Sequence, residues 1–328
     1  MYAASMLWVR FSCIFSLLVL QRLIRDANSV SSINSNHQII SSMKNAAIQK
    51  STFTQLEVDK VIKSIQNLVP SSCDHAIPWN DLSTFISKFA HESHTEWVKT
   101  ERGAKELESF LSNPNDGTFR HIFHRVLKDG NWDDAVLAKQ TGLQDKPWVV
   151  LITGLNGIRK TTSTKQPWFQ EAIRLSLGEA VDLDSLPSGR NSFFRQLDYI
   201  IATIANEDFK ALYQITDIDE YVRYKDAIFA RYRTLAEMIG VVLVKAAIGK
   251  RINVLVETSG RDIAMFEYVD AFFSSADYRK LVVHFTINNL QYAEQSVDSR
   301  MRNEVRLGAE ALAAASDARW LISLSMLY

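Results

Sequence analysis

The chain has few cysteines, no net charge and no long uninterrupted apolar run, and each lack excludes a class of protein. Its 328 residues include two cysteines, Cys13 and Cys73, and 37 Lys and Arg residues balance 37 Asp and Glu residues. Two cysteines outside a CxxC spacing are too few for a disulfide framework and form no cysteine-based metal motif. Because a neutral chain has no net field that attracts polyanions, we expect no nucleic-acid partner.

The N-terminal residues 1–27 contain an apolar stretch and no acid before Asp26. The stretch, Phe11 to Leu20, is too short to cross a bilayer, and Arg10 separates it from the apolar residues before it. The residues that follow make a poor cleavage site for a secretory signal, whereas an acid-free, Arg-containing start is compatible with an organellar presequence. We therefore predict organellar or membrane targeting, with membrane contact only through residues 6–20; without such targeting the protein would be cytoplasmic.

The rest of the composition is that of a globular protein, with 47% hydrophobic and 23% charged residues. Residues 28–50 are rich in Ser and Asn and are expected to form a linker. In residues 51–140, apolar side chains such as Val61 and Ile65 recur at helical spacing, which predicts a small helical domain. An α/β domain is expected over residues 147–328.

The helical region contains two histidine pairs, His91 with His94 and His121 with His124. The i, i+3 spacing would place each pair on one helix face, where four histidines could bind a metal ion. The competing hypothesis is that they are ordinary exposed or partly buried histidines. We favour the second hypothesis, because such short patterns often arise without a metal.

The segment Pro147 to Ser163, PWVVLITGLNGIRKTTS, has the pattern of a buried strand that runs into a phosphate-binding loop. Such a loop presents backbone N–H groups to phosphate oxygens, a lysine to the outer phosphates and a hydroxyl to Mg²⁺. The spacing is that of GxxxxGK[ST], except that Arg159 replaces the second glycine. The residues expected to bind the nucleotide phosphates are Gly154, Asn156, Gly157, Arg159, Lys160, Thr161 and Thr162.

Two residues depart from a regular phosphate loop. Arg159 has a Cβ where glycine would let the backbone approach the phosphates, although its N–H remains and its guanidinium can itself bind phosphate. Pro167 lies seven residues after Lys160 and would break the second turn of the following helix. We therefore expect either a kinked helix or two helical pieces after the loop.

From Trp148 onward, apolar runs alternate with helical stretches, which is typical of parallel α/β units. After the loop strand, further strands are expected at residues 180–183, 252–256 and 280–287. Helices are expected at residues 219–248 and 290–306, and in the segment that contains Arg195 and Asp198.

Acidic side chains follow two of the predicted strands at their carboxyl ends, where open α/β sheets bind their ligands. The strand at residues 180–183 leads into Asp182 and Asp184, either of which would act as the base for an acceptor hydroxyl. We favour Asp184, by a small margin over Asp182 and Asp198. The strand at residues 252–256 leads into Glu257, which is expected to support Mg²⁺ together with the hydroxyl of Thr161.

Phosphoryl transfer requires positioning and charge neutralisation more than covalent chemistry. Lys160 is therefore expected to bind the outer phosphates, and Arg300 or Arg302 the migrating phosphoryl group. The alternative for these arginines, together with Arg306, is an ordinary solvated helix face that pairs with nearby acids.

These motifs together resemble the zeta-toxin family of P-loop small-molecule kinases over roughly residues 147–306, about half of the chain. GLNGIRKT is similar to the phosphate loop of that family, and AVDLDS resembles the strand whose final acid serves as base, here Asp184. VLVETSGR resembles the strand that ends in Glu-Gly-Thr, with Glu257 as the acid and Ser259 keeping the hydroxyl. SVDSRMRNE resembles the arginine-bearing helix, at Arg300.

The resemblance implies a three-layer P-loop NTPase-type α/β core with a mainly parallel sheet, here preceded by a helical region. It also implies ATP or GTP with Mg²⁺ as cofactors and a small hydroxylated molecule as phosphoryl acceptor, with Asp184, Lys160 and Arg300 as the catalytic residues. Two other hypotheses stay open. Arg159 and Pro167 favour a degenerate P-loop protein that binds nucleotide without chemistry, and the helical N-terminal region would suit an interaction protein.

Overall fold

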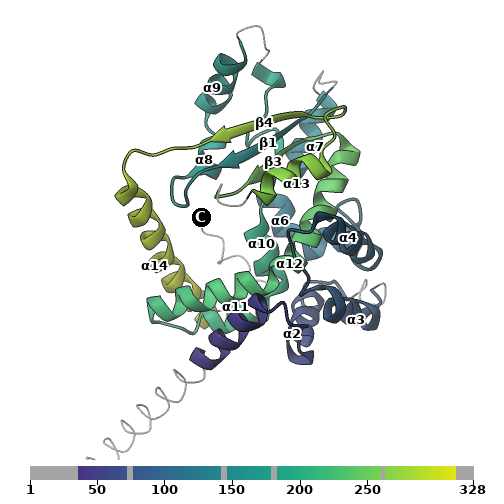
Figure 1. The fold of residues 1–328 in the computed structure, drawn as a ribbon, viewed down its shortest axis with the longest axis vertical. Helices are drawn as coiled ribbons and strands as arrows, with labels where there is room; N and C mark the ends of the chain where they lie inside the picture. The colour runs from purple at the N-terminus through teal and green to yellow at the C-terminus, as the bar shows by residue number, and fades with distance from the viewer. Residues whose placement is uncertain (1–35, 72–76, 142–145, 179–182, 260–262, 315–328) are drawn as a thin grey trace, which may run out of the picture.

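The computed structural model describes residues 36–71, 77–141, 146–178, 183–259 and 263–314. At its centre, four parallel strands form one sheet in the order β2-β3-β1-β4 (Figure 1). The strands are β1 (Trp148–Thr153), β2 (Ser192–Arg195), β3 (Asn253–Glu257) and β4 (Arg279–His284). The expected α/β fold with a parallel sheet is confirmed.

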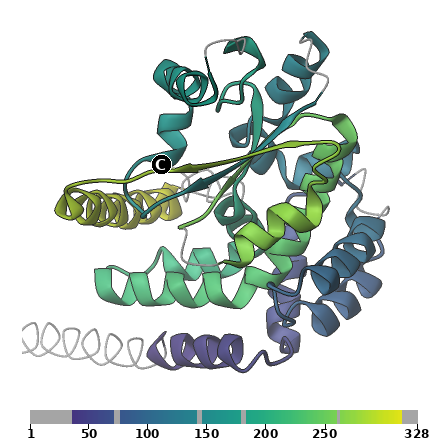
Figure 2. The ribbon, with the colours of Figure 1, turned by 45° about the horizontal axis from the view of Figure 1, so that its top comes forward.

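Helices lie on both sides of the sheet, because the side chains of the central strands alternate between two cores (Figure 2). In β1, Val149 and Leu151 belong to a large apolar cluster, whereas Val150 and Ile152 belong to a smaller one with Phe169 of α9 (Pro167–Leu177). The sequence of a strand that is buried on both faces is a continuous run of apolar residues. This explains why the first strand could be recognised from WVVLI.

The region before the sheet is helical, as predicted. Its helices are α2 (Gln55–Gln66), α3 (Trp79–Phe89), α4 (Trp97–Leu111), α5 (Gly117–Ile122), α6 (His124–Asp129) and α7 (Trp132–Thr141). A further helix covers residues 36–48, inside the expected linker, and buries Ile40 and Met43. The large apolar cluster runs from these residues through the helical region to the sheet, so the two parts share one core.

The helix α12 (Ile218–Lys250) has 33 residues and packs against both α4 and α10 (Leu197–Ile204). Its N-cap residue is Asp217, whose side chain accepts a hydrogen bond from the backbone N–H of Glu220. Most of its second half is buried. The remaining elements are α8 (Lys160–Thr164), the 3-10 turn η2 (Leu183–Ser185), α11 (Asn206–Leu212), α13 (Ala264–Phe272) and α14 (Leu290–Ala314).

The prediction of a strand at residues 180–183 is wrong at Leu183, which lies in η2; residues 180–182 are outside the described ranges. The strand that pairs with β3 is β2, whose two phenylalanines face opposite cores. Phe194 also donates its N–H to the carbonyl of Gly130 at 2.7 Å, a contact from the helical region. A strand of four residues that depends on such a distant contact has too little pattern to be recognised. The helix expected to hold both Arg195 and Asp198 is also corrected, because Arg195 is the last residue of β2 and only Asp198 lies in α10. The other predicted strands and helices are present with shifted ends.

Pro167 divides the chain after the loop into two helices. Of the two expectations, a kinked helix or two helical pieces, the second is confirmed. α8 ends at Thr164, Gln166 is extended, and α9 begins with Pro167 at its first position. Proline suits this position, because its missing N–H would have no partner inside the helix. The carbonyl of Thr164 instead accepts a hydrogen bond from the N–H of Gly189 at 2.8 Å.

The histidine pairs do not lie on helix faces as predicted. His91 and His94 lie in the connection between α3 and α4, and His121 and His124 belong to different helices that Phe123 separates. Within the described ranges, no group of three or more His, Cys, Asp or Glu side chains could hold a metal ion. The i, i+3 spacing failed here because two short helices replace the continuous helix that it assumes.

Residues 1–27, and with them the predicted targeting segment, lie outside the described ranges. Among the helices that the structure does describe, none has both the length and the apolar character needed to cross a membrane.

A buried ion pair joins α12 to the sheet. Arg195, at the end of β2, donates from Nη1 to Oε2 of Glu237 at 2.6 Å, and their side chains are 2% and 0% exposed. The guanidinium also lies over the ring of Tyr268, and Gly240 leaves space for it, since a Cβ there would meet Nη1 at 2.8 Å. Burial alone would raise the pKa of Glu237, but Arg195 and Arg233 hold it below its ordinary value.

We predict that Glu237→Gln lowers the free energy of unfolding by about 3–5 kcal/mol at neutral pH, because it leaves a buried guanidinium without its counter-ion. Because the pKa of Glu237 is lowered by folding, the contribution of the carboxylate is complete above its ordinary pKa and is lost as the pH falls through the folded-state pKa. The difference between wild type and variant should therefore shrink in acid. Urea unfolding at neutral and acidic pH measures both effects.

The exposed acid of α13 provides the control: Glu267→Gln should change the free energy of unfolding by less than about 0.5 kcal/mol. Equal effects of the two substitutions would contradict a special role for the buried pair.

Candidate functional site

The loop between β1 and α8 has an unusual backbone. Gly154 and Gly157 have φ angles of 138° and 85°, and Arg159, just before the helix, has φ 58°. Arg159 thus adopts the left-handed conformation that a glycine would take at that position, at a cost of about 1–2 kcal/mol. Positive φ angles on either side of Ile158 are compatible with the alternating backbone conformations of anion-binding nests.

Both loop glycines also lie where a side chain would not fit. A Cβ on Gly154 would meet the carbonyl oxygen of Phe285 at 2.5 Å, and one on Gly157 would meet that of Ala293 at 2.4 Å. Phe285 follows β4 and Ala293 belongs to α14, so these contacts hold the loop against both elements. The glycines are therefore required by packing as well as by backbone conformation.

Lys160 lies under the loop and is only 4% exposed. Its Nζ donates to the carbonyl oxygens of Gly154 and Leu155 at 2.8 and 2.9 Å. Within the described part of the chain, the backbone N–H groups of Lys160, Thr161 and Thr162 have no hydrogen-bond acceptor. The loop therefore combines a buried cation with backbone donors that remain available to an anion.

Glu257 stands beside this lysine because β1 and β3 are neighbours in the sheet. Ile152 pairs with Glu257, and the N–H of Thr258 donates to the carbonyl of Ile152 at 2.9 Å. Oε2 of Glu257 accepts a hydrogen bond from Oγ1 of Thr161 at 2.8 Å, and Oε1 lies 3.2 Å from Nζ of Lys160. The two residues predicted to support a metal ion are thus in direct contact.

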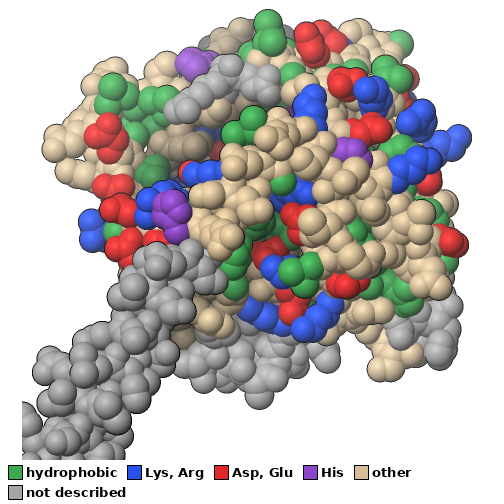
Figure 3. All heavy atoms as spheres, turned by 60° about the horizontal axis from the view of Figure 1, so that its bottom comes forward, with side chains coloured by type: hydrophobic (Ala, Val, Ile, Leu, Met, Phe, Trp, Pro, Cys, Tyr) green, Lys and Arg blue, Asp and Glu red, His purple; other side chains and the backbone are tan. Residues whose placement is uncertain are grey.

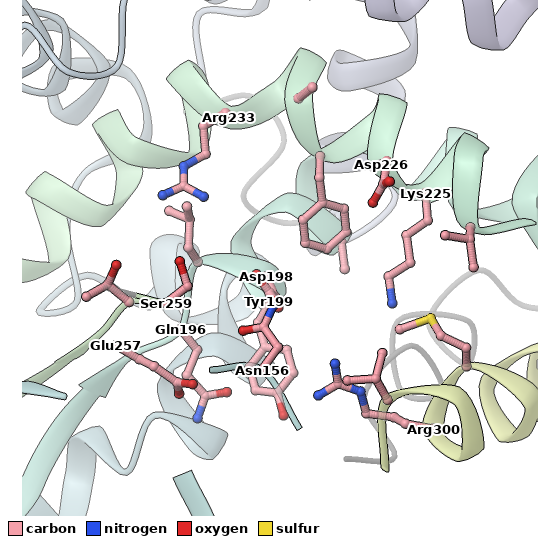
Figure 4. A pocket seen from close by; sticks show the side chains of 18 of the residues that line it. Asn156, Gln196, Asp198, Tyr199, Lys225, Asp226, Arg233, Glu257, Ser259 and Arg300 are labelled. Atoms are coloured by element: carbon pink, nitrogen blue, oxygen red, sulfur yellow. The ribbon is translucent and has the colours of Figure 1, made fainter. Parts of the chain in front are cut away.

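The loop forms one wall of a cleft of about 2450 Å³. Its other walls come from the end of β3, from α10, from α12 and from α14. Figure 4 shows the space between Glu257 and Asn156 on one side and Arg233, Lys225 and Arg300 on the other. The predicted residues that line the cleft are Asn156, Gly157, Arg159, Lys160, Thr161, Thr162, Asp198, Glu257, Ser259, Arg300 and Arg302.

The cleft is richer in basic than in acidic groups although the chain is neutral. Twelve of its lining residues are Lys or Arg, against six Asp or Glu. Several of the basic groups are held by acids, as Lys160 is by Glu257. On the face shown in Figure 3, basic and acidic side chains are intermixed. The local excess therefore favours an anionic ligand in the cleft rather than attraction by the whole surface.

Of the three acids considered as base, the structure describes two, Asp184 and Asp198, and places them in different elements. Asp184 lies in η2, whose neighbouring carbonyls, those of Leu183 and Leu186, accept hydrogen bonds from Gln170 of α9. Asp198 lies in the first turn of α10, directly after β2, and its exposed side chain lines the cleft (Figure 4). Asp182 is outside the described ranges. Asp198 thus occupies the strand-end place that the sequence interpretation gave to Asp184, because β2 is the strand of the sheet.

The arginines of α14 differ in their surroundings. Arg300 and Arg302 line the cleft, whereas Arg306 binds Glu310 and Asn303 on the outside. One turn beyond Arg300, the buried Glu304 fastens α14 to α12.

Glu304 accepts hydrogen bonds from the hydroxyl of Tyr221 at 2.7 Å and from Nζ of Lys225 at 2.6 Å. Burial and the neighbouring Glu304 carboxylate raise the pKa of Tyr221 well above its ordinary value, so the hydroxyl remains a donor. The contact fixes the helix that carries the two cleft arginines.

Sequence reasoning missed the wall that α12 and α10 provide. Lys225, Asp226, Phe229 and Arg233 recur at the spacing of one helix face, which is the signal that would have grouped them. From α10, Tyr199 joins this wall, and burial, with the nearby Asp129 carboxylate, raises its pKa to about 12. Nothing in the sequence indicates that this face lies opposite the loop.

No protein-family model matches the chain, and neither a curated protein nor a solved structure is similar to it.

We predict that Gly157→Ala lowers the free energy of unfolding by about 1–2 kcal/mol, because alanine disfavours a positive φ. The new Cβ would in addition press on the Ala293 carbonyl and displace α14. Gly249→Ala is the matched control, since no atom lies within 4 Å of its Cβ position in α12. The control should stabilise the helix by about 0.5–1 kcal/mol. Denaturant unfolding of both variants tests the prediction, and a neutral effect at residue 157 would contradict it.

Proposed function

We propose that the chain is a P-loop NTPase-type protein that binds a purine nucleoside triphosphate with Mg²⁺ in this cleft, and that it is a kinase for a hydroxylated small molecule. The observation that carries the proposal is the contact among Lys160, Thr161 and Glu257 at the end of a glycine-containing loop. A cation, a hydroxyl and a carboxylate within hydrogen-bond distance of one another are the groups that phosphate and Mg²⁺ need.

The loop residues have chemistry that fits phosphate. Lys160 would exchange its two carbonyl acceptors for phosphate oxygens, which accept a charge-assisted hydrogen bond. The N–H groups of Lys160, Thr161 and Thr162, which have no acceptor in the described part of the chain, would bind further oxygens. Arg159 and Asn156 line the cleft beside them.

The donor set also suits Mg²⁺. Thr161 and Glu257 offer hard oxygen ligands, and Mg²⁺ is usually bound through one or two carboxylates, with phosphate oxygens and waters completing its shell. In this role the ion would neutralise charge on the phosphates during transfer. Glu257 would then release the Thr161 hydroxyl from its present hydrogen bond.

For the acceptor, we propose Asp198 as the base in preference to Asp184. Asp198 lines the cleft and, within the described chain, makes no hydrogen bond or ion pair, so its carboxylate is available to accept a proton from an acceptor hydroxyl. Arg300 and Arg302, on the facing helix, would bind the charge of the phosphoryl group in flight.

A second function, nucleotide binding without transfer, is favoured by one specific observation. Arg159 takes a strained left-handed conformation at the position where a regular phosphate loop has glycine. Its Cβ lies on the backbone that must approach the phosphates. Nucleotide binding with no turnover on a broad panel of hydroxyl compounds would support this second function.

We predict that Lys160→Met weakens Mg²⁺–ATP and Mg²⁺–GTP binding at least about tenfold, since it removes a charge-assisted hydrogen bond worth about 1.5–3 kcal/mol. Methionine keeps the buried stem of the side chain, so the fold should survive. Calorimetric titration of each nucleotide, with and without Mg²⁺, measures the loss of affinity. It also shows whether the protein prefers ATP or GTP.

Lys105→Ala removes an exposed lysine of α4 outside the cleft and should leave nucleotide affinity unchanged. Wild-type affinity in a folded Lys160→Met variant, or no nucleotide binding by the wild type, would refute the proposal.

We predict that Asp198→Asn lowers the rate of phosphoryl transfer about 10²–10⁴-fold, the usual contribution of a general base, with nucleotide affinity retained. Asp184→Asn should leave the rate within a few-fold of wild type. Transfer from γ-labelled ATP to a panel of sugars, polyols and nucleosides measures both. If Asp184→Asn abolishes transfer and Asp198→Asn does not, the assignment of the base is reversed.

A further inference from the structure

Two arginines share one carboxylate on the α12 wall of the cleft. Nε and Nη2 of Arg233 lie 3.0 and 2.9 Å from Oε1 of Glu237. The other carboxylate oxygen accepts the hydrogen bond from Arg195 at 2.6 Å. The three residues Arg195, Arg233 and Glu237, here called the arginine pair, therefore carry a formal net charge of +1.

The surplus charge lies where water solvates it only in part. Glu237 is fully buried and Arg195 is 3% exposed, whereas the side chain of Arg233 is 35% exposed. A net charge at a partly buried position is costly unless an opposite charge approaches it. In addition, Nε of Arg195 is buried and has no acceptor within the described chain. An anionic oxygen that approaches Arg233 from the cleft would neutralise the surplus charge.

The arginine pair is also rigidly built. Arg195 is enclosed by the face of Tyr268, 4.7 Å from the ring centroid, and by the space that Gly240 leaves. Glu237 in turn fixes Arg233 by two contacts to a single oxygen, which orients its guanidinium. A pre-oriented guanidinium loses little further entropy when it binds a carboxylate or phosphate.

The arginine pair and the phosphate loop belong to different walls of the cleft. In Figure 4, the guanidinium of Arg233 projects from α12 into the cleft, toward Ser259 and Glu257 rather than toward Asn156 of the loop. The cleft volume, about 2450 Å³, exceeds the roughly 300–1,000 Å³ of ordinary ligand pockets. There is room for a second molecule beside a nucleotide.

We infer that the arginine pair is a binding site for a carboxylate or phosphate group of the second substrate, so that the acceptor is an anionic hydroxyl compound. This inference rests on the proposed function for the role of the bound anion, although the anion site itself does not require it. Arg233 would bind the anion directly, and Arg195 and Glu237 would hold Arg233 in place.

The anion site is tested on the full chain with inorganic phosphate and with acetate, each against chloride at equal ionic strength, in the presence of saturating Mg²⁺–ADP to fill the loop. If ADP does not bind, the Lys160→Met variant is titrated without nucleotide. Phosphate or acetate should raise the melting temperature in a saturable manner. Arg233→Gln should weaken that binding roughly tenfold or more, because it removes a charge-assisted contact. A response to phosphate alone indicates a phosphorylated acceptor, and one to acetate alone a carboxylated acceptor.

Arg233→Gln leaves the buried Arg195 with its counter-ion, so the variant should fold, and Arg233→Lys should recover part of the binding. Arg223→Gln is the matched control, since Arg223 lines the cleft on the same helix and its Nε donates to the backbone carbonyl of Asp219, with no acidic partner among the described residues. Binding that is insensitive to Arg233, or equally sensitive to Arg223, overturns the inference.

A transfer assay distinguishes this failure from failure of the proposed function. Pairs of hydroxyl compounds that differ by one phosphate or carboxylate, such as glycerol and glycerol 3-phosphate, serve as acceptors. The anionic member should have a KM at least tenfold lower in wild type, and Arg233→Gln should remove that preference without changing the affinity for ATP. Transfer without any preference refutes the anionic acceptor alone, whereas the absence of nucleotide binding refutes the proposed function alone.

Discussion

Parallel pairing of β1 with β3 is the constraint on which the site depends. The register places Ile152 opposite Glu257, so the acid at the end of one strand reaches the helix that begins after the other. Lys160 and Thr161, which lie on that helix, can then share the two oxygens of Glu257. A shift of the pairing by one residue would turn the acid to the other face of the sheet and separate the three groups.

The loop and α12 meet this constraint in different ways. In the loop, two glycines allow the neighbouring backbone to approach closely, and Arg159 adopts a strained left-handed conformation. α12 is held in place by its buried residues, and its one fully buried acid, Glu237, forms an ion pair with the arginine at the end of β2. The same ion pair that fastens α12 to the sheet therefore also sets the face that α12 turns toward the loop.

The parts of the molecule that sequence reasoning predicted are those with local signals. The strand of β1 is a continuous apolar run, the contact between Thr161 and Glu257 follows from two strand ends in a parallel sheet, and α12 has a long apolar period. β2 was missed because its four residues are buried by contacts from the helical region. The sequence interpretation therefore sought an acid after residues 180–183 and favoured Asp184, whereas the acid that follows β2 is Asp198.

The wall of the cleft formed by α12 could not be predicted from the sequence, for a different physical reason. Arg195 and Glu237 are 42 residues apart, and nothing local indicates that their charges pair in the core or that Arg233 adds a second cation to one carboxylate. Motifs describe the groups that a phosphate loop needs, because those groups are close in sequence or follow strand ends. The groups that would select the second substrate come from the packing of α12 against the sheet, and only the assembled core brings them opposite the loop.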